Sequence, residues 1–418
     1  MAGDSFKAPV GTRDVLPPES DQWQQLVATF AAHARRAGYG LVVSPLFEDL
    51  GVFQRVGEGT DIVRKEMYEL EDKGGRRLAL RPEGTAPIAR AYIQHRPSTP
   101  WKAWYVAPNF RYERPQAGRH RQHHQLGAEL IGTSDPESDV EMVTMAWDFL
   151  RAVGLTRVDL CINSMGDQEG RAAFVELLRA YLREQAGELA PEDREKIDTH
   201  PLRVLDSKRR ATRDVTAEAP RLIDHLSDQA ARRFDAVQEG LRSLGVPFVL
   251  EPRLVRGLDY YTHTTFELQA SALDAAQDAV GGGGRYDGLI GALGGPPTPG
   301  IGFGLGIERL LLALAAEGAA AAAPGGPAVW VVDVADGRSA RALTHELRRA
   351  GVAADRAFDG RSMKAQMKAA DRSGAQLALI VGEVELEAGE VAVRDLRGSS
   401  EQRKVRRDDI VKHVLERL

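Results

Sequence analysis

The chain has 418 residues and a formal net charge of -5. Its length allows two or three domains with separate cores, and its weak negative charge excludes a polycationic nucleic-acid binder. The single cysteine, Cys161, excludes an intrachain disulfide framework and a cysteine-rich zinc site. No apolar run is long enough to span a bilayer, and the N-terminus lacks the apolar core of a signal peptide. We therefore expect a cytoplasmic protein without a membrane partner.

The first hundred residues predict short elements joined by turns. These elements are a helix at 19–37, an edge strand at 41–45, a strand at 77–80 and a helix at 86–95. Thr85 stands just before the second helix, where threonine often serves as the N-cap. Glu83 and Thr85 suit an ammonium group at the mouth of the loop equally well, so two interpretations of this loop remain open.

The stretch from Trp104 to Gly132 predicts a β-hairpin. Two strands, at 104–113 and 121–131, flank a turn-forming loop at 114–118. The two-residue period of the second strand places on one face Arg119, Arg121, His123, Gln125, Gly127 and Glu129. Arginine suits bidentate binding of phosphate, and four arginines lie in or beside the loop: Arg111, Arg114, Arg119 and Arg121. The alternative interpretation is an edge hairpin with a solvated polar face.

The middle of the chain changes from mixed elements to helix alone. A helix at 135–153 and a strand at 155–163 precede a charged region at 168–244 that lacks strand signals. We interpret this region as an inserted helical module. Its basic run Lys208-Arg209-Arg210 is typical of a solvated face rather than of a binding patch.

Two glycine-rich segments follow a predicted strand at 262–269. The first, Gly281 to Gly288, has the spacing of neither a dinucleotide-binding fingerprint nor a phosphate-binding Walker loop. As a run of glycines it predicts a flexible turn. The alternative is a close approach of the backbone to a small ligand.

The second segment has glycine at every second position from Gly300 to Gly306. In a strand this pattern leaves one face without side chains, and such a face packs poorly unless something flat lies on it. A helix predicted at 307–316 puts Arg309 in its first turn, beside that face. We expect a planar base there, with Arg309 stacked on it or bound to phosphate. Close helix packing is the alternative.

An alanine-, glycine- and proline-rich stretch at 318–327 predicts a domain boundary. The elements predicted beyond it are a strand at 328–334, a helix at 338–350, strands at 376–381 and 391–396, and a helix at 408–418. Their alternation predicts a small α/β domain with a mixed sheet.

Several of these motifs together resemble the histidine–tRNA ligase family of class II aminoacyl-tRNA synthetases. The features general to the class are the first long helix with Pro45, the run Phe110-Arg111-Tyr112-Glu113, and the run from Gly304 to Arg309. The features specific to histidine are the run Leu254-Val255-Arg256-Gly257-Leu258-Asp259-Tyr260-Tyr261 and the run Gly283-Gly284-Arg285-Tyr286-Asp287-Gly288. The resemblance covers essentially the whole chain.

This resemblance implies an α+β fold. It implies an antiparallel-sheet catalytic domain of six or seven strands over 1–325, with a helical insertion at about 168–244. A C-terminal α/β anticodon-binding domain over 326–418 completes the implied chain. The implied reaction joins L-histidine to the 3′-end of histidine tRNA, with ATP as substrate, and a histidyl-adenylate is its intermediate. The resemblance also implies a homodimer and Mg²⁺ carried by the ATP phosphates.

The resemblance assigns expected roles residue by residue. The catalytic residues it implies are Arg256 and Arg111. The residues it implies for histidine binding are Glu83, Gly84, Thr85, Gln125, Glu129, Tyr260, Tyr261 and Tyr286. The residues it implies for ATP binding are Arg111, Glu113, Arg119 and Arg309. The chain departs from the family at Val10, where arginine is usual, and at His123, where phenylalanine is usual.

Other interpretations of the sequence are open at this stage. His120, His123 and His124 suggest a zinc site, but strand alternation puts His123 and His124 on opposite faces, so we expect no protein metal site. A regulatory relative without catalysis would lack the domain after Pro327. An RNA-binding module would leave the bare glycine strand beside Arg309 unexplained.

Overall fold

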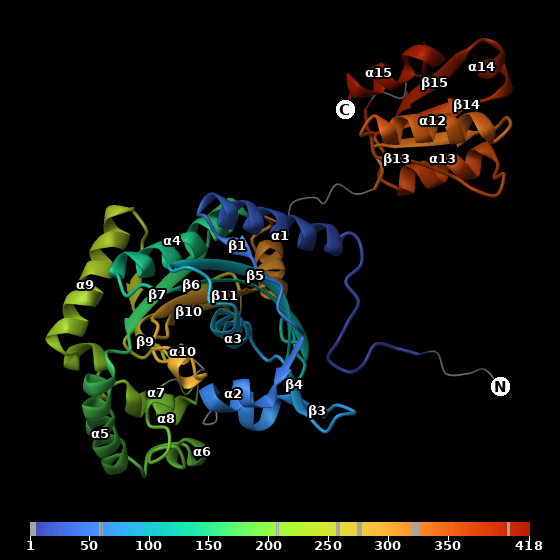
Figure 1. Cartoon of the computed structure of the whole chain (residues 1–418). Helices are drawn as coiled ribbons and strands as arrows, with labels where there is room; N and C mark the ends of the chain where they lie inside the picture. The colour runs from blue at the N-terminus through green and yellow to red at the C-terminus, as the bar shows by residue number, and fades with distance from the viewer. Residues whose placement is uncertain are drawn as a thin grey trace. The chain divides into compact units, whose positions relative to one another are not determined.

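The computed structural model describes residues 6–57, 60, 62–205, 207, 209–255, 260–273, 278–319, 326–398 and 402–418. The chain forms two compact units (Figure 1). The first comprises Met1–Val15 and Gln22–Ala321, and the second comprises Leu16–Asp21 and Ala322–Leu418. Within the described ranges, no helix is both long and apolar enough to cross a membrane.

An eight-stranded sheet forms the centre of the first unit. Its strands, in spatial order, are β1 (Gly40–Leu41), β5 (Trp101–Phe110), β6 (Gln122–Ile131), β11 (Gly300–Gly306), β10 (Ala279–Arg285), β9 (Thr262–Ala270), β7 (Val158–Ser164) and β8 (Val249–Leu250). The six long strands pair antiparallel, while the two-residue strands β1 and β8 add parallel edges. The predicted α+β class with an antiparallel catalytic sheet is confirmed, but the sheet has eight strands instead of the implied six or seven, because the short edges β1 and β8 add two.

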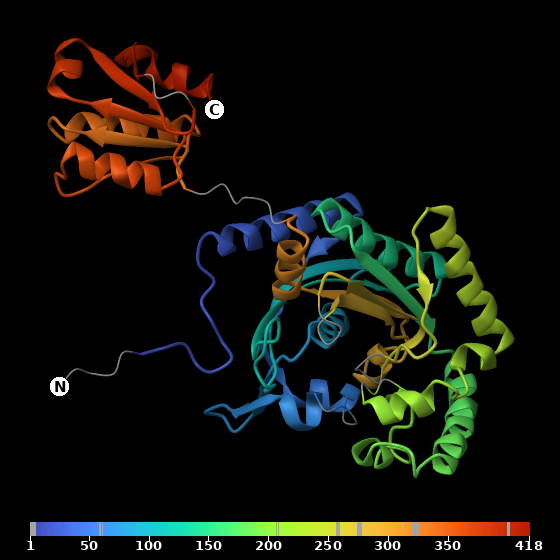
Figure 2. The same cartoon turned by 180° about the vertical axis from the view of Figure 1, so that it is seen from behind.

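Helices cover one face of this sheet, and the main core lies beneath them (Figures 1 and 2). They are α1 (Glu19–Arg36), α4 (Pro136–Ala152), α9 (Asp228–Ser243) and α11 (Ile307–Ala316). The alternation of β6 turns Leu126, Ala128 and Leu130 into this core, as predicted. Phe30 of α1 meets Phe149 and Phe303 edge to face, with ring centroids 5.1 and 6.0 Å away.

The opposite face of the sheet carries the polar side chains of β6. Beside it lie α3 (Thr85–His95), α10 (Leu289–Ala292) and α2 (Leu50–Gly57) (Figure 1). A second, three-stranded sheet has the order β2 (Phe47–Asp49), β4 (Arg77–Leu80) and β3 (Tyr68–Glu71). A short π-helix spans Ile62–Glu66.

The region predicted as a helical insertion is helical. It contains α5 (Gln168–Glu184), α6 (Pro191–Arg194), α7 (Leu202–Leu205), α8 (Arg210–Thr216), a 3-10 turn at Leu222–His225, and α9. The insertion has its own apolar core around Phe174, Leu178 and Leu182. Val255 and Tyr261 of the catalytic part pack against that core. The insertion and the sheet therefore share one packed body.

The second unit is the predicted α/β domain with a mixed sheet. Its strands, in spatial order, are β13 (Ala354–Arg356), β12 (Val329–Asp333), β14 (Leu377–Val381), β15 (Glu390–Asp395) and β16 (Gln402–Arg406). The first three are parallel and the last two antiparallel. Its helices are α12 (Arg338–Arg349), α13 (Met363–Arg372), α14 (Glu383–Glu387) and α15 (Ile410–Leu415). Four elements of this unit were not predicted, namely β13, α13, α14 and β16, because their many polar residues obscure the periodicity.

Three local predictions were wrong in extent or kind. The strand expected at 41–45 ends at Leu41, because only Gly40 and Leu41 pair with β5. The first hairpin strand ends at Phe110, so Arg111 and Glu113 lie in the loop beyond it. The glycine run at 281–284 is no turn but part of β10, a central strand. A Cβ at Gly283 would lie 2.7 Å from Phe303 Cα, so close approach of the neighbouring strand requires glycine there.

Candidate active site

The hairpin of β5 and β6 supplies the polar face of the site. Residues that oppose one another across the hairpin include the pairs Tyr105↔Gly127 and Asn109↔His123. On its other side β6 pairs with β11, where Gly302 opposes Glu129 and Gly306 opposes Gln125. The side chains of Gln125 and Glu129 therefore lie beside the glycines of β11, which place no side chain on that face of the sheet.

Glu129 is fully buried and accepts three hydroxyl hydrogen bonds. Thr85 Oγ1 donates to its Oε1 at 2.8 Å, Tyr105 Oη donates to the same oxygen at 3.1 Å, and Tyr286 Oη donates to Oε2 at 2.6 Å. Burial raises the pKa of Glu129 to about 8, although these donors oppose the shift. No cationic side chain hydrogen-bonds to this carboxylate in the described structure, so the cluster can receive a cationic or hydrogen-bonding ligand.

Glu83 caps helix α3. Its carboxylate accepts from the backbone N–H groups of Thr85 at 2.6 Å and Ala86 at 2.9 Å. Burial raises the pKa of Glu83, while these two N–H groups and Arg111 oppose the rise. The N-cap position itself is Gly84, so the interpretation of Thr85 as the N-cap was wrong. The glutamate satisfies the helix end and thereby leaves the Thr85 hydroxyl to Glu129.

Aromatic rings enclose this cluster of hydroxyls and carboxylates. The rings of Tyr260 and Tyr261 lie 4.9 Å apart and those of Tyr260 and Tyr286 lie 6.0 Å apart, measured between centroids. The Tyr260 hydroxyl is buried and has no hydrogen-bond partner among the described residues. Tyr105 was not predicted as part of the site. Its ring packs so closely on Gly84 and Gly127 that a Cβ at either position would overlap it. The only feature that distinguishes Tyr105 from other tyrosines of the chain is this contact with two glycines.

The row of glycines in β11 is largely covered by neighbouring side chains. Tyr286 lies over Gly300, the Glu129 carboxylate over Gly302, and the Gln125 amide over Gly304. These side chains occupy the face over Gly300, Gly302 and Gly304, so the planar base expected beside Arg309 stays a prediction for the Gly306 end. The open end is at Gly306, where a Cβ would lie 3.9 Å from Arg309 Cβ. The glycines of β11 therefore make room mainly for the side chains of Gln125, Glu129 and Tyr286.

Cationic side chains gather at this open end. Arg111 Nε donates to Pro82 O at 2.8 Å, and Arg309 Nη1 donates to Ala279 O at 2.5 Å. Glu113 lies between Arg111 and Arg119, with N···O distances of 4.0 and 3.7 Å. These contacts fix the guanidinium groups at one end of the cluster formed by Glu83 and Glu129.

Two of the three histidines of the hairpin have different surroundings. Burial, and after it the nearby Arg111 guanidinium, lower the pKa of His123 to about 3, so its imidazole is neutral at neutral pH. His124 points the other way, with Nδ1 2.8 Å from Glu308 Oε1 and its ring edge to face with Trp23. Across the described ranges, no three histidine, cysteine, aspartate or glutamate side chains converge as metal ligands.

The structure describes Gln125 but not Arg256. Gln125 Oε1 accepts from Asn109 Nδ2 at 2.7 Å, and Asn109 is fully buried. Asn109, which orients the Gln125 amide, was not predicted as part of the site. Arg256 lies outside the described residues.

A buried ionic network fixes the end of β10, next to Tyr286. Arg285 is fully buried, and its Nη2 donates to Asp139 Oδ2 at 2.7 Å and to Ser138 Oγ at 2.6 Å. Arg285 Nη1 also donates to Asp287 Oδ1 at 3.1 Å. From the insertion, Arg233 Nη2 donates to the same Asp139 oxygen at 2.6 Å. The network thus joins α4, α9 and the glycine-rich strand β10. Nothing in the local sequence pattern predicted it.

Comparison with known proteins bears on the whole chain. The family model described as histidyl-tRNA synthetase matches residues 11–310, and the one described as anticodon binding domain matches residues 329–417. Histidine–tRNA ligases from Geobacillus kaustophilus and Mycolicibacterium vanbaalenii are 45% and 48% identical to this chain, over 422 and 420 residues. Each of these alignments covers 99% of both chains.

A solved structure agrees with these sequence matches. The crystal structure of apo S. aureus histidyl-tRNA synthetase superimposes with a TM-score of 0.82 at 35% identity, covering 98% of this chain and 100% of that one. Sequence, fold and both domains thus lead to one assignment. The chain belongs to the histidyl-tRNA synthetase family of class II aminoacyl-tRNA synthetases.

Proposed function

We propose that this protein attaches L-histidine to the 3′-end of histidine tRNA in two steps, of which the first consumes ATP. The observation that carries the proposal is the polar face of β6, where a carboxylate cluster at Glu129 adjoins a guanidinium group at Arg111 and another at Arg309. The carboxylates suit a cationic amino acid, and the guanidinium groups suit the phosphates of ATP. The two substrates would therefore meet between them.

The histidine side of the site is proposed to consist of residues around Glu83 and Glu129. The ammonium group of the substrate would bind to Glu83, Thr85, Gln125 and Glu129. The imidazole would lie among Tyr260, Tyr261 and Tyr286, close to Gly84. The unpartnered Tyr260 hydroxyl supports this, because a buried hydroxyl gains from a ring nitrogen that can donate or accept.

The ATP side is proposed to consist of the guanidinium groups and their carboxylate neighbour. Arg111, Arg119 and Arg309 would hold the phosphates and the adenine, with Glu113 orienting the first two. Arg256 is proposed to contact the reacting α-phosphate. Neutral His123 lies near Arg111 and Arg309, so its ring adds a surface for the base without adding charge.

In the first step, a carboxylate oxygen of histidine bonds to the α-phosphorus of ATP, and the bond from that phosphorus to the bridging oxygen breaks. Pyrophosphate leaves with the electron pair of that bond, and histidyl-adenylate remains. Negative charge grows on the phosphoryl oxygens, so fixed guanidinium groups stabilise the transition state. In the second step, a terminal hydroxyl of the tRNA attacks the histidyl carbonyl and AMP leaves.

Mg²⁺ is proposed to arrive on the phosphates of ATP, as Mg²⁺ commonly does in nucleotide-binding enzymes. The carboxylates around Arg111 are taken up by arginines and backbone N–H groups, so they offer no cage for a free ion. When bound, the ion would neutralise phosphate charge. The residues above bind and orient the substrates.

The remaining proposals concern domains and partners. We propose a catalytic domain over 1–325 and an anticodon-binding domain over 326–418.

The helical insertion is proposed to contact tRNA and not to edit, because a pocket that hydrogen-bonds a polar ring discriminates without editing. Hydrolysis of mischarged tRNA by this region would contradict that role. The cytoplasm is the proposed location.

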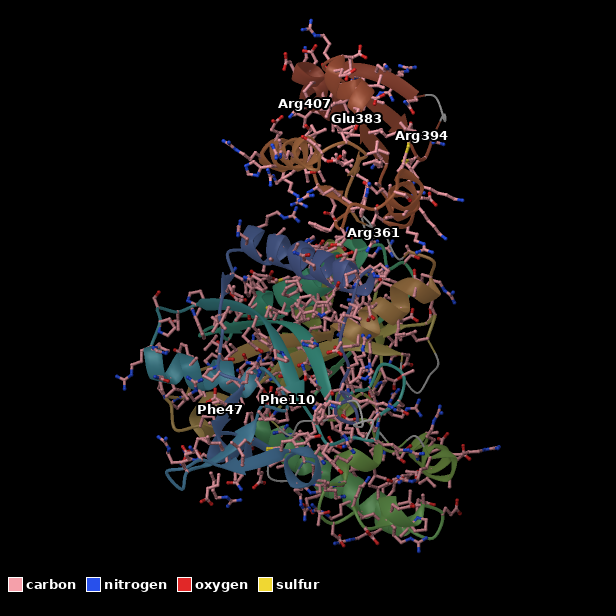
Figure 3. All side chains as sticks on the ribbon, turned by 90° about the vertical axis from the view of Figure 1, so that its right-hand side faces the viewer. Phe47, Phe110, Arg361, Glu383, Arg394 and Arg407 are labelled. Atoms are coloured by element: carbon pink, nitrogen blue, oxygen red, sulfur yellow. The ribbon has the colours of Figure 1, made fainter. Side chains whose placement is uncertain are left out.

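A homodimer is proposed from the exposed apolar residues that follow α1. Leu41, Val43 and Phe47 are 54, 86 and 52% exposed, and such clusters on a surface indicate a protein interface (Phe47 is labelled in Figure 3). Elution as a monomer at working concentration would contradict it.

The test of the proposed function is ATP–pyrophosphate exchange with each standard amino acid. Exchange is expected with histidine alone. Exchange of similar rate with another amino acid, or none with histidine, would reject the assignment. Charging of tRNA with labelled histidine then tests the second step separately.

A further inference from the structure

Glu308 is a buried carboxylate to which the chemistry proposed above gives no role. It lies in the first turn of α11, directly before Arg309, and its side chain is 8% exposed. Both of its oxygens accept from the backbone N–H of His124, Oε1 at 3.1 Å and Oε2 at 3.0 Å. His124 Nδ1 also lies 2.8 Å from Oε1, and because a carboxylate can only accept, this ring nitrogen carries the proton of the hydrogen bond.

The contacts of Glu308 keep its carboxylate ionised. Burial acts to raise the pKa of Glu308, but the hydrogen bonds from His124 outweigh burial, so this pKa lies below its ordinary value. The helix supports the charge as well, because N–H groups in the first turn of a helix favour an anion. Glu308 is therefore a charged acceptor that holds one residue of β6.

The place of this contact in the sheet explains why a side chain is needed there. The pairing of β6 with β11 ends at Gln125 and Gly306, where the chain turns into α11. The start of β6, from Gln122 to His124, extends past that point and is paired with β5. The N–H of His124 therefore meets the start of a helix instead of a strand, and the Glu308 carboxylate takes the place of a strand carbonyl.

The same contact joins the two elements that carry the cationic end of the site. Arg111 and Arg119 belong to the loop of the hairpin, whereas Arg309 belongs to α11. A hydrogen bond from Arg309 Nε to Gly118 O also joins these elements, but at 3.4 Å it is long and therefore weak. The carboxylate contact, one residue before Arg309, is the shorter link.

The arginines of the site repel one another, so their proximity requires a restraint. Burial lowers the pKa of Arg309, and the nearby guanidinium groups of Arg119 and Arg111 lower it further, while Glu113 and Glu267 oppose them. Like charges move apart unless the elements that carry them are fixed. Guanidinium groups that are already in place stabilise developing phosphoryl charge without the cost of reorganisation.

We propose that Glu308 is a positioning residue for ATP: it fixes α11 to β6 and thereby holds Arg309 beside the arginines of the hairpin. The inference rests on the proposed function, because it takes these arginines as the ATP side of the site. His124 packs its ring edge to face with Trp23 of α1, on the face of β6 opposite His123. Glu308 therefore acts through the backbone of the strand and the helix and not through contact with the nucleotide.

The test is calorimetric titration of ATP with Mg²⁺, and separately of histidine, into the full-length protein. E308Q keeps the shape of the side chain but removes its charge and one acceptor. It should raise the Kd for ATP about tenfold, the factor that corresponds to one charge-assisted hydrogen bond, and leave the Kd for histidine unchanged. H124F keeps a ring against Trp23 and removes only the Nδ1 donor, so it should raise the Kd for ATP by a smaller factor. The double variant should bind ATP no more weakly than E308Q, because both changes break one contact.

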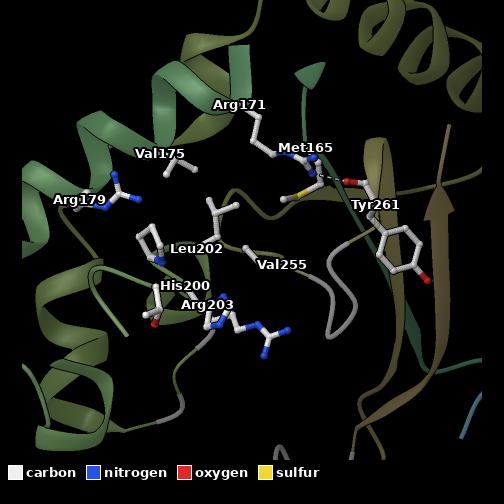
Figure 4. Close-up of a pocket in the computed structure, with 11 residues that line it drawn as sticks. Met165, Arg171, Val175, Arg179, His200, Leu202, Arg203, Val255 and Tyr261 are labelled. Carbon is white, nitrogen blue, oxygen red and sulfur yellow. Dashed lines mark hydrogen bonds between the residues drawn. The ribbon is translucent and has the colours of Figure 1, made fainter. Parts of the chain in front are cut away.

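The other end of α11 offers a matched control. Glu317 accepts from the backbone N–H groups of Thr156 and Arg157 at 2.8 and 3.0 Å and from the Thr156 hydroxyl at 2.8 Å. E317Q removes the same kind of contact from the same helix, so it should lower the unfolding temperature without changing the Kd for ATP. R171Q is a second control, because Arg171 Nη1 donates to the backbone oxygen of Tyr261 at 2.5 Å, on the histidine side of the site (Figure 4). It should also leave the Kd for ATP unchanged.

A Kd for ATP in E308Q equal to that of the wild type would overturn the proposal. An equal rise in E317Q or R171Q would do the same, because ATP binding would then report a general loosening of the fold. If E308Q does not fold, H124F compared with E317Q decides in the same way.

R309Q separates a failure of this inference from a failure of the proposed function. If R309Q weakens ATP binding and E308Q does not, the inference alone is wrong. If R309Q binds ATP as the wild type does, the ATP side of the site is wrongly placed, and the role of Glu308 falls with it.

Discussion

At the scale of single residues, the site depends on two buried carboxylates treated differently by the fold. Glu83 receives two backbone N–H groups at the start of a helix, whereas Glu129 receives only hydroxyls. Backbone N–H groups at a helix N-terminus stabilise negative charge, and neutral hydroxyls do so less. Glu129 is therefore the carboxyl whose charge should depend most on the ligand.

The first prediction concerns substrate selectivity. Glu129→Gln keeps the shape of the side chain and removes its charge. It should raise the KM for histidine by about 10–100-fold, as expected for loss of a hydrogen bond to a charged group, and change the KM for ATP little. Pyrophosphate exchange at varied concentrations of each substrate measures both. A raised KM for ATP with an unchanged KM for histidine would move Glu129 to the nucleotide side.

The second prediction concerns pH. Burial raises the pKa of Glu129 to about 8, above its ordinary value, so the unliganded carboxyl is mostly protonated at pH 7. Its protonation stabilises the fold below pH 4.5, and this contribution is lost as the pH rises through about 8. A bound ammonium group favours the carboxylate, so histidine binding at pH 7 should release close to one proton. Calorimetry in two buffers of different ionisation enthalpy measures the release, which Glu129→Gln should abolish.

The third prediction tests the role proposed for Arg256. Arg256→Ala should slow adenylate formation by about 10²–10³-fold, the size of effect typical for loss of one preorganised donor at developing charge. Histidine binding measured without ATP should change little. Near-normal exchange by a folded variant would remove Arg256 from the chemistry.

At the scale of elements, the glycines of the central strands β10 and β11 leave space that neighbouring strands and side chains fill. Glycine lets each strand approach its neighbours, and the space gained on β11 holds the side chains of Glu129 and Gln125. The strands are therefore both a packed part of the sheet and the floor of the site. Arg285, at the end of β10, anchors this floor through Asp139 of α4 and, through it, Arg233 of α9.

The fourth prediction follows from that floor. In Gly302→Ala the new Cβ would overlap the Glu129 carboxylate and lie 2.8 Å from the Ala128 carbonyl oxygen. We expect a loss of about 1–3 kcal/mol in the free energy of unfolding, as for other overpacked cores, and a raised KM for histidine. Thermal unfolding and exchange kinetics measure the two effects. Gly291→Ala is the control, because nothing lies within 4 Å of its Cβ, and equal behaviour of the two variants would contradict the argument.

At the scale of the whole molecule, two units with separate cores carry the two proposed roles, catalysis and anticodon binding. The core of the second unit includes Val329, Leu343, Leu379 and Ile410 and is closed without residues of the catalytic sheet. Each unit can therefore keep its own fold when the chain between them is cut. The anticodon-domain match at 329–417 lies wholly in the second unit.

The fifth prediction separates the units. A chain ending at Ala323 should still form histidyl-adenylate but should charge tRNA at least about tenfold less efficiently, since stacked bases contribute about 1–3 kcal/mol each to RNA binding. Exchange and charging, measured side by side on the same preparation, give the two rates. Unchanged charging efficiency would mean that the second unit does not bind the anticodon.

The sequence by itself determined the elements whose pattern is local. The two-residue period of β6, the helical period of α1 and the composition of 318–327 each depend on neighbours in the chain, so the hairpin, the helix and the boundary could be predicted. The motifs were long enough to indicate the family. The strand at 281–284 was missed, because glycine carries no preference that distinguishes a turn from a crowded central strand.

Only the tertiary structure decided how the site is assembled. The donors to Glu129 lie 24, 44 and 157 residues away along the chain, and Asp139 lies 146 residues from Arg285. Contacts of such separation leave no period in the sequence, because they arise from the order in which strands pair in the sheet. The raised pKa of Glu129 has the same origin, since burial depends on what the folded chain places around a carboxyl and not on the residues beside it.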